Sequence, residues 1–149
     1  MSTFAVPESD WRRVSNCASE VDGIRLRYAK FLKAMAEVVG TVRVYVPDLA
    51  IEVDASQERA VVRSFAGECQ VHLGWRVNGE ELEGVAVFSK KIDGPSFQPL
   101  LNVYLTERGG QHMTLASGEI YRLDMRPGDF AYAALMNVVW KQVELSTQV

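Results

Sequence analysis

The chain has few of the residues that form disulfides, metal sites and catalytic centres. Only two cysteines and two histidines occur among its 149 residues. Cys17 and Cys69 are far apart in the sequence, and we expect two free thiols rather than a bridge. The sequence has no Cys-x-x-Cys, His-Glu-x-x-His or calcium-loop pattern. We therefore expect no metal site and no cofactor.

Long apolar runs and strong charge are also missing. The longest apolar run, residues 130–136, is far shorter than the roughly 18–20 residues that cross a membrane. The first ten residues lack the basic region and apolar segment of a secretory signal, so we expect a cytoplasmic protein. The net charge is −3, which gives no overall positive field to attract nucleic acid.

The composition suits one ordinary globular domain. Hydrophobic residues make up 48% of the chain and charged residues 23%, close to the averages for soluble proteins. No repeat, low-complexity segment or linker divides the chain. We predict a single domain over residues 1–149 with an α+β fold. Its expected parts are an N-terminal helix or helix pair, an antiparallel β-meander of six to eight strands, and a C-terminal helix.

The first quarter has the period of a helix. Apolar residues recur every three or four positions from Trp11 to Val38, which places them on one face. Gly40 is expected to end the helix. Gly23 interrupts the stripe, and an unbroken helix would be about 45 Å long, more than a small domain covers. The favoured interpretation is a break beside Gly23 into two helices. The alternative is one helix whose free half meets a partner.

Residues 41–125 have the period of two that is typical of strands. Asn78 and Gly79 form a preferred pair for a two-residue hairpin turn. A turn centred there pairs Trp75 with Leu82 and places Arg76 opposite Glu81, a favourable cross-strand pair.

Glycines predict two further tight turns. A turn at Ala66 and Gly67 sets Val62 opposite Val71, and one at Gly109 and Gly110 sets His112 near Glu107. Turns this short leave no room for the crossover helices of a parallel sheet, so we expect an antiparallel sheet. A helix-grip-like arrangement is the alternative, and it requires a short strand before Glu8 followed by two helices.

The end of the chain has the pattern of a second helix. Pro127 suits a first turn, and nearly every residue from Phe130 to Trp140 is apolar. A helix that is apolar on most sides is buried on most sides. We expect this helix to lie across the sheet or in an interface.

No catalytic residue can be named, because nucleophile-elbow and phosphate-loop motifs are missing. Two sets of residues are candidate sites. A basic side of the first helix is a candidate contact for a protein partner: Arg25, Arg27, Lys30 and Lys33. A second set could line a pocket between the sheet and the C-terminal helix: His72, Trp75, Tyr104, Tyr121 and Trp140.

The expected function is non-catalytic binding to another protein, as an interaction, adaptor or inhibitor-like protein that is itself a homodimer. The long helical stripe and the mixed sheet face around Val61, Val85 and Val87 leave apolar surface with no assigned cover. Symmetric pairing is the commonest way to bury such surface. The alternative is a small-ligand-binding or enzymatic pocket under the C-terminal helix. We expect weak or no binding to DNA at physiological salt.

Overall fold

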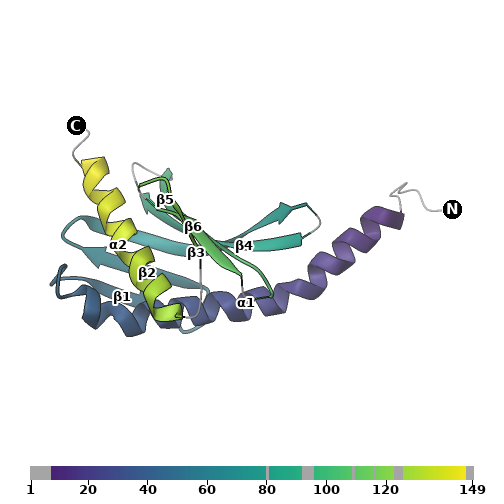
Figure 1. Ribbon diagram of the computed structural model, residues 1–149, viewed down its shortest axis with the longest axis horizontal. Coiled ribbons are helices and arrows are strands. Elements are labelled where there is room, and N and C mark those ends of the chain that lie inside the picture. Colours follow the sequence, from purple (N-terminus) through teal and green to yellow (C-terminus); the bar gives the residue numbers. More distant parts are fainter. Residues whose placement is uncertain are drawn as a thin grey trace.

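The fold is α+β, as predicted. A computed structural model describes residues 8–79, 81–91, 96–108, 110–115, 117–122 and 126–146. Seven antiparallel strands follow one another across a single sheet in chain order (Figure 1). The elements are α1 (Glu8–Val42), β1 (Ala50–Val53), β2 (Arg59–Ser64), β3 (Gly67–Asn78), β4 (Glu81–Lys91), β5 (Phe97–Leu105), β6 (Gln111–Thr114), β7 (Ile120–Arg122) and α2 (Pro127–Ser146).

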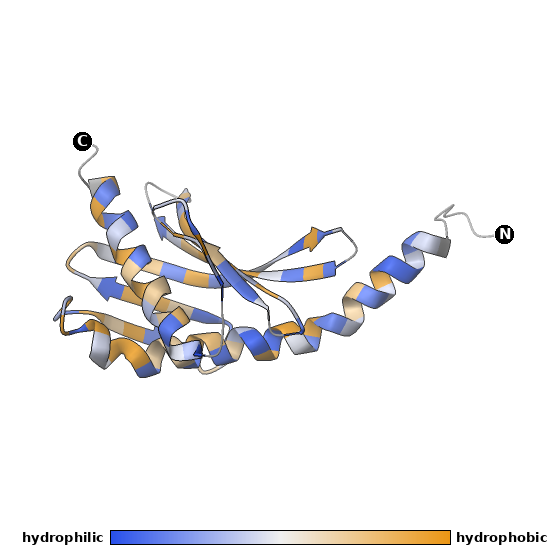
Figure 2. Ribbon diagram, in the orientation of Figure 1, coloured by the Kyte–Doolittle hydropathy of each residue, from blue (hydrophilic) through white to orange (hydrophobic). Residues whose placement is uncertain are grey.

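Both helices pack on the same face of the sheet. The Phe31 ring of α1 makes edge contacts with Phe88 of β4 and Phe130 of α2, with centroids 6.2 Å and 6.0 Å away. Alternate strand residues are buried on this side, and hydrophobic and hydrophilic residues alternate along the strands in Figure 2. No described helix covers the other side, which we call the open face. Neither helix in the described ranges is long and apolar enough to cross a membrane.

α1 is one unbroken helix, so the predicted break at Gly23 is wrong. A Cβ atom at Gly23 would lie 2.6 Å from Cγ of Glu107, in the β5–β6 connection. The glycine therefore allows close packing and does not end the helix. The helix also continues past Gly40 to Val42. One helix precedes the sheet, instead of the two that the helix-grip-like alternative requires, and residues before Glu8 lie outside the described ranges.

The N-terminal third of α1 projects beyond the sheet (Figure 1). Inward-facing residues from 24 to 42 are no more than 7% exposed: Ile24, Tyr28, Phe31, Leu32, Met35, Val39 and Val42. The spacing of three or four between apolar residues continues at Val14 and Trp11, but these side chains are 63% and 60% exposed. We call residues 8–19 the overhang.

The β3–β4 hairpin forms at the predicted place in a different register. Trp75 pairs with Gly84 and not with Leu82, because Asn78 pairs with Glu81. Gly79, with φ of 65°, is therefore the first residue of the turn, and residue 80 lies outside the described ranges. A shift of two residues keeps every side chain on its predicted face. Arg76 accordingly lies opposite Glu83 instead of Glu81.

The β2–β3 hairpin shows the same two-residue difference. Ser64 pairs with Gly67, so Val62 faces Cys69 instead of Val71. The side chains again keep their predicted faces.

The β5–β6 connection is longer than predicted, and here the faces change. The Thr106 amide donates to the Gly110 carbonyl at 2.9 Å, which ends β5 at Leu105. His112 therefore pairs with Tyr104, and the predicted neighbour Glu107 lies in the connection. Gly109 lies outside the described residues.

Candidate interaction surfaces

The four basic residues predicted to contact a partner do not form one patch. At about 100° per helical residue, Arg25 and Arg27 point in nearly opposite directions. The Arg25 guanidinium carbon lies 6.0 Å from the ring centroid of Trp75. Nε of Arg27 donates to the carbonyl oxygen of Glu107 at 3.5 Å on the other side of the helix. Lys30 and Lys33 are exposed.

The five residues predicted to line a pocket are divided among three places. His72 and Tyr104 lie on the open face, since they pair with Val87 and Val85 there. Trp75 and Tyr121 lie on the helix side, where the Tyr121 ring is 5.7 Å from that of Phe130. Trp140 is exposed on the outer side of α2. These side chains do not surround a common space.

Apolar side chains fill the space between α2 and the sheet. The inward residues of α2 are at most 1% exposed: Phe130, Ala131, Ala134, Leu135 and Val138. Two hollows stand out among the described residues. The smaller, of about 390 Å³, lies between Glu20 of α1 and the neighbouring hairpin ends, and the larger has a volume of about 1410 Å³. No α2 residue lines either of them.

The larger hollow is an open groove beside an unpaired edge of β3. β2 pairs with β3 only as far as His72, which faces Arg59, whereas β4 pairs with it as far as Asn78. Residues 73–78 therefore have no partner on their β2 side among the described strands. Leu73 and Trp75 of this segment line the groove together with Leu26 of α1.

Exposed apolar side chains flank this edge. Trp75 and Val77 project to the helix side, because a Cβ atom at Gly84, the partner of Trp75, would lie against Ile24 of α1. Both are exposed, and so is Leu26. Trp11 lies on the same side of α1 as Arg25, about four turns away. We call residues 73–78 together with Leu26 the open-edge surface.

The open-edge surface lacks the usual protection of a sheet edge. Natural proteins blunt exposed edges with lysine, proline or bulges. Residues 73–78 contain one charged side chain, Arg76, which points to the open face. Its Nη2 atom lies 2.8 Å from Oε1 of Glu83, and its guanidinium carbon lies 3.8 Å from the ring centroid of Tyr104. No charge within the segment faces the helix side.

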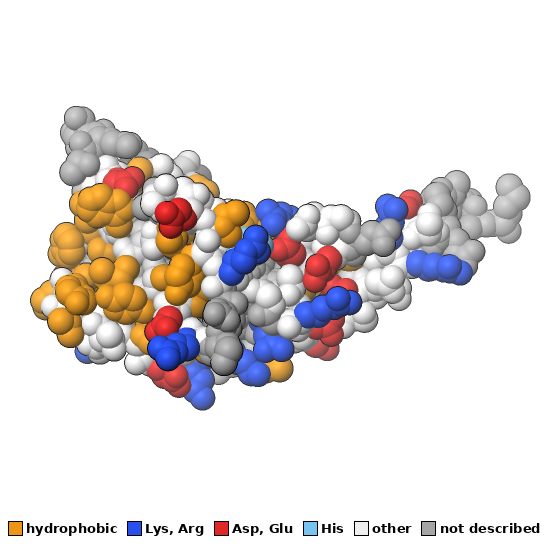
Figure 3. Space-filling view, in the orientation of Figure 1, with side chains coloured by type: hydrophobic (Ala, Val, Ile, Leu, Met, Phe, Trp, Pro, Cys, Tyr) orange, Lys and Arg blue, Asp and Glu red, His pale blue; other side chains and the backbone are white. Residues whose placement is uncertain are grey.

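A second apolar surface lies at the opposite end of the molecule. Figure 3 shows hydrophobic side chains gathered over α2 and the connection between α1 and β1. Nε2 of Gln142 in α2 lies 3.7 Å from the place that a Cβ of Gly67 would occupy, so α2 reaches the β2–β3 turn. We call four side chains, each more than half exposed, the helix-end patch: Val44, Tyr45, Phe65 and Trp140.

The open face carries a packed polar cluster. Glu83 is buried there beside Arg76, and the rings of Tyr104 and His112 stack with centroids 4.9 Å apart. Burial lowers the pKa of His112; nearby Glu83 opposes this shift, and Arg122 and Arg76 reinforce it. The arginine balances the buried carboxylate. The arrangement suits a structural ion pair and a neutral imidazole.

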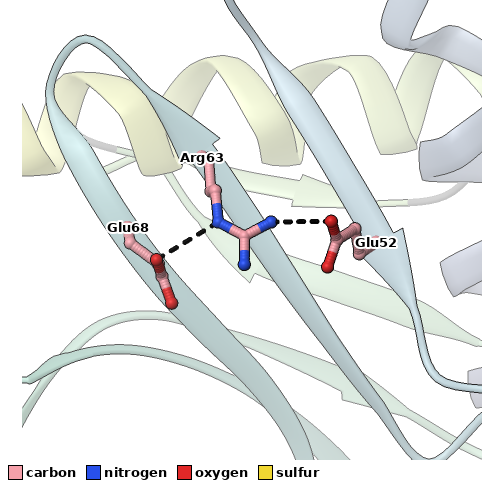
Figure 4. Close-up of polar contacts among 3 residues, drawn as sticks. All are labelled: Glu52, Arg63 and Glu68. Carbon is pink, nitrogen blue, oxygen red and sulfur yellow. Dashed lines mark hydrogen bonds and ion pairs between the residues drawn. The ribbon is translucent and has the colours of Figure 1, made fainter.

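Arg63 makes a second, exposed ion network on this face. Its Nη1 atom lies 2.9 Å from Oε1 of Glu52 in β1, and its Nε lies 3.2 Å from Oε2 of Glu68 in β3 (Figure 4). The hydrogen bonds to Glu52 and Glu68 raise the pKa of Arg63. Water and salt screen all three groups, so the network aligns three strands and adds little stability.

Both cysteines are free thiols, as predicted. Burial raises the pKa of Cys69 to about 12, so this thiol stays protonated and unreactive at neutral pH. Cys17, in the overhang, is partly exposed. Within the described part of the chain, no three His, Cys, Asp or Glu side chains are grouped closely enough to hold a metal ion.

No family model, curated protein or solved structure matches this chain, so its function has to be inferred from its geometry.

The unpaired edge of β3 is the feature that sequence reasoning missed. Its signal is a difference in length: β3 has 12 residues and β2 has 6. A strand that extends beyond the end of its neighbour has an unpaired edge there.

Proposed function

We propose that this protein binds other protein chains without catalysing a reaction, as an adaptor or inhibitor-like protein, and that it is a homodimer. The observation that carries the proposal is the exposure of large apolar side chains in both the open-edge surface and the helix-end patch. Monomeric proteins rarely leave extended apolar areas in water, and such areas commonly mark interaction sites.

The two surfaces suit different occupants. The open-edge surface combines free backbone groups with apolar side chains, which is the requirement for adding a strand. The helix-end patch has no strand edge, and its Tyr45 and Trp140 are of the residue types enriched where proteins meet. We assign the open-edge surface to a second copy and the helix-end patch to a different protein. The two free thiols support a cytoplasmic location as part of this proposal.

The assignment of the helix-end patch is tested by co-purification from an extract of the source cell. Three tagged chains are compared: wild type, Trp140→Glu and Ile120→Glu. Ile120 is an exposed apolar residue of β7 outside both surfaces, so its variant is the matched control. We expect at least one protein that is retained by wild type and by the control and lost with Trp140→Glu. An identical set of proteins on all three chains would contradict the assignment.

The homodimer is tested separately, by sedimentation equilibrium of the pure chain. We expect a mass that rises with concentration toward twice 16.6 kDa. Trp75→Glu should hold the mass at that of one chain, because it places two buried like charges at the shared edge. Ile120→Glu should sediment as wild type.

A further inference from the structure

We propose that two copies of this chain join by antiparallel pairing of their β3 edges over residues 73–77, about a two-fold axis at Trp75. The inference deepens the proposed homodimer and rests on it. The product is one sheet that runs through both copies, with both helix layers on the same side. Three features of the edge lead to this arrangement: its length, its alternation and its single charge.

The length of the free edge limits how many residues of an added strand can pair with β3. Arg59 of β2 already occupies the place beside His72, and β3 ends at Asn78. An added strand therefore finds free backbone groups only along residues 73–78. In a two-fold arrangement the added strand is the same segment running in the opposite direction.

Alternation limits the register. Residues that lie opposite one another in an antiparallel pair point to the same face. Trp75 and Val77 point to the helix side, whereas Gly74 and Arg76 point to the open face. A continuous sheet must pair helix-side residues with helix-side residues. The axis therefore passes through a residue, and not between two residues.

The single charge and the end of β2 then select that residue. An axis at Arg76 would place two guanidinium groups opposite each other, and like charges in this position destabilise a sheet. An axis at Gly74 would reduce the overlap to residues 73–75, because β2 blocks the rest. An axis at Trp75 uses all of residues 73–77.

The register at Trp75 is complementary in both size and charge. Leu73 lies opposite the partner's Val77, and the two Trp75 side chains meet at the axis on the helix side. Arg76 lies opposite the partner's Gly74, which has no side chain to obstruct it, so Arg76 keeps its ion pair with Glu83. Within residues 73–77 no two like charges lie opposite each other, because Arg76 is the only charged residue of the segment. This self-complementarity points to a second copy as the occupant, in preference to a foreign strand.

Disulfide trapping tests the register. Residues on the axis of an antiparallel pair have Cα atoms about 4.5–5.5 Å apart, within the range that a disulfide spans. Trp75→Cys, in a Cys17→Ser background, should form a disulfide-linked dimer under mild oxidation. Val77→Cys in the same background is the matched control. Its two cysteines would be about 13 Å apart along the strands and should link at least tenfold more slowly.

A second trap retains Trp75. Leu73→Cys and Val77→Cys chains, each in the Cys17→Ser background, are mixed and oxidised. These positions lie opposite each other in the proposed register, so the mixture should yield a dimer with one chain of each kind. Cys69 is buried and does not compete in either experiment.

The outcomes separate this inference from the homodimer itself. If wild type sediments as a dimer and neither trap closes, the β3 register is wrong and the homodimer stands. A wild-type chain that remains monomeric at every concentration would overturn both. If Trp75→Cys links only to a different protein in an extract, the edge accepts a foreign strand and the second-copy proposal is overturned. Closure of both traps, with slow linking of Val77→Cys alone, is the expected result.

Discussion

The two halves of α1 carry apolar residues at the same spacing of three or four, but in different surroundings. From Ile24 onward the stripe is buried against the sheet and α2, whereas Trp11 and Val14 in the overhang are exposed. β3 shows the same division, because its first half is paired on both sides and residues 73–78 are paired on one. Period and spacing thus decide which side of an element is apolar, and the neighbouring elements decide whether that side is covered.

α1 and the β3–β4 hairpin contact each other. The Leu82 amide of the hairpin donates to Oε2 of Glu20 in α1 at 3.3 Å. Ile24 packs beneath Gly84 one helical turn further on. Both contacts join α1 to β4 of the β3–β4 hairpin, just C-terminal to the overhang.

The largest expected effect contrasts two aromatic residues of α1. Phe31→Ala should lower the free energy of unfolding by about 3–5 kcal/mol, because it leaves a cavity where α1, β4 and α2 meet. Trp11→Ala should change it by less than about 0.5 kcal/mol, as expected for an exposed site. Urea unfolding of both variants at one protein concentration gives the comparison. Equal losses would mean that the overhang is covered in solution.

Two glycines test how closely the covered half of α1 packs against the sheet. Gly84→Ala should cost about 1–3 kcal/mol, because its Cβ would clash with Cγ2 of Ile24. Gly40→Ala has nothing within 4 Å of the new atom and should stabilise the helix by about 0.5–1 kcal/mol. Thermal unfolding of both variants checks the signs. A neutral Gly84→Ala would contradict the packing of Ile24 beneath the hairpin.

A buried amide makes the covered region less stable than it could be. Gln142 is fully buried, and neither its Oε1 nor its Nε2 has a hydrogen-bond partner among the residues that the structure describes. Gln142→Met removes this unpaired polar group and should raise the free energy of unfolding by about 1–2 kcal/mol. Gln70→Met, at an exposed position on the open face, is the control and should have little effect. A loss of stability in Gln142→Met would show that the amide has a partner in solution.

The smallest expected effect is a pH dependence on the open face. The pKa of His112 is lowered in the folded state by burial, so the unfolded chain binds its proton first as the pH falls. The stability associated with neutral His112 is therefore present above the unfolded pKa of about 6.5 and is lost as the pH falls below it. His112→Gln should make unfolding less pH-dependent in this range. Parallel curves for both chains would contradict the burial of His112.

Local signals predicted the kinds of elements better than their limits. Asn78 and Gly79 identified a hairpin, but the turn begins at Gly79 instead of Asn78, and the register shifted by two residues. The period of two preserved the faces despite this shift. At the β5–β6 connection the register shifted by three residues, so the side chains changed faces. A hydrogen bond from the Thr106 amide to the Gly110 carbonyl closes a longer turn than predicted, and His112 therefore pairs with Tyr104.

The candidate surface depended on contacts that the sequence does not display. Gly23 has the character of a helix breaker, and the close approach of Glu107, far away in the chain, accounts for a glycine at this place within the helix. Exposure of Trp75 depends on where β2 stops, and the alternation within β3 gives no information on that point. The basic side of α1 failed as a patch for a geometric reason, since Arg25 and Arg27 lie on opposite sides of one helix.

Sedimentation equilibrium of wild type and Trp75→Glu over a range of micromolar concentrations tests the central claim most directly. If the open-edge surface joins two copies, wild type approaches twice 16.6 kDa, whereas Trp75→Glu stays at 16.6 kDa. A wild-type mass fixed at 16.6 kDa, or a Trp75→Glu chain that dimerises as well as wild type, would contradict the account.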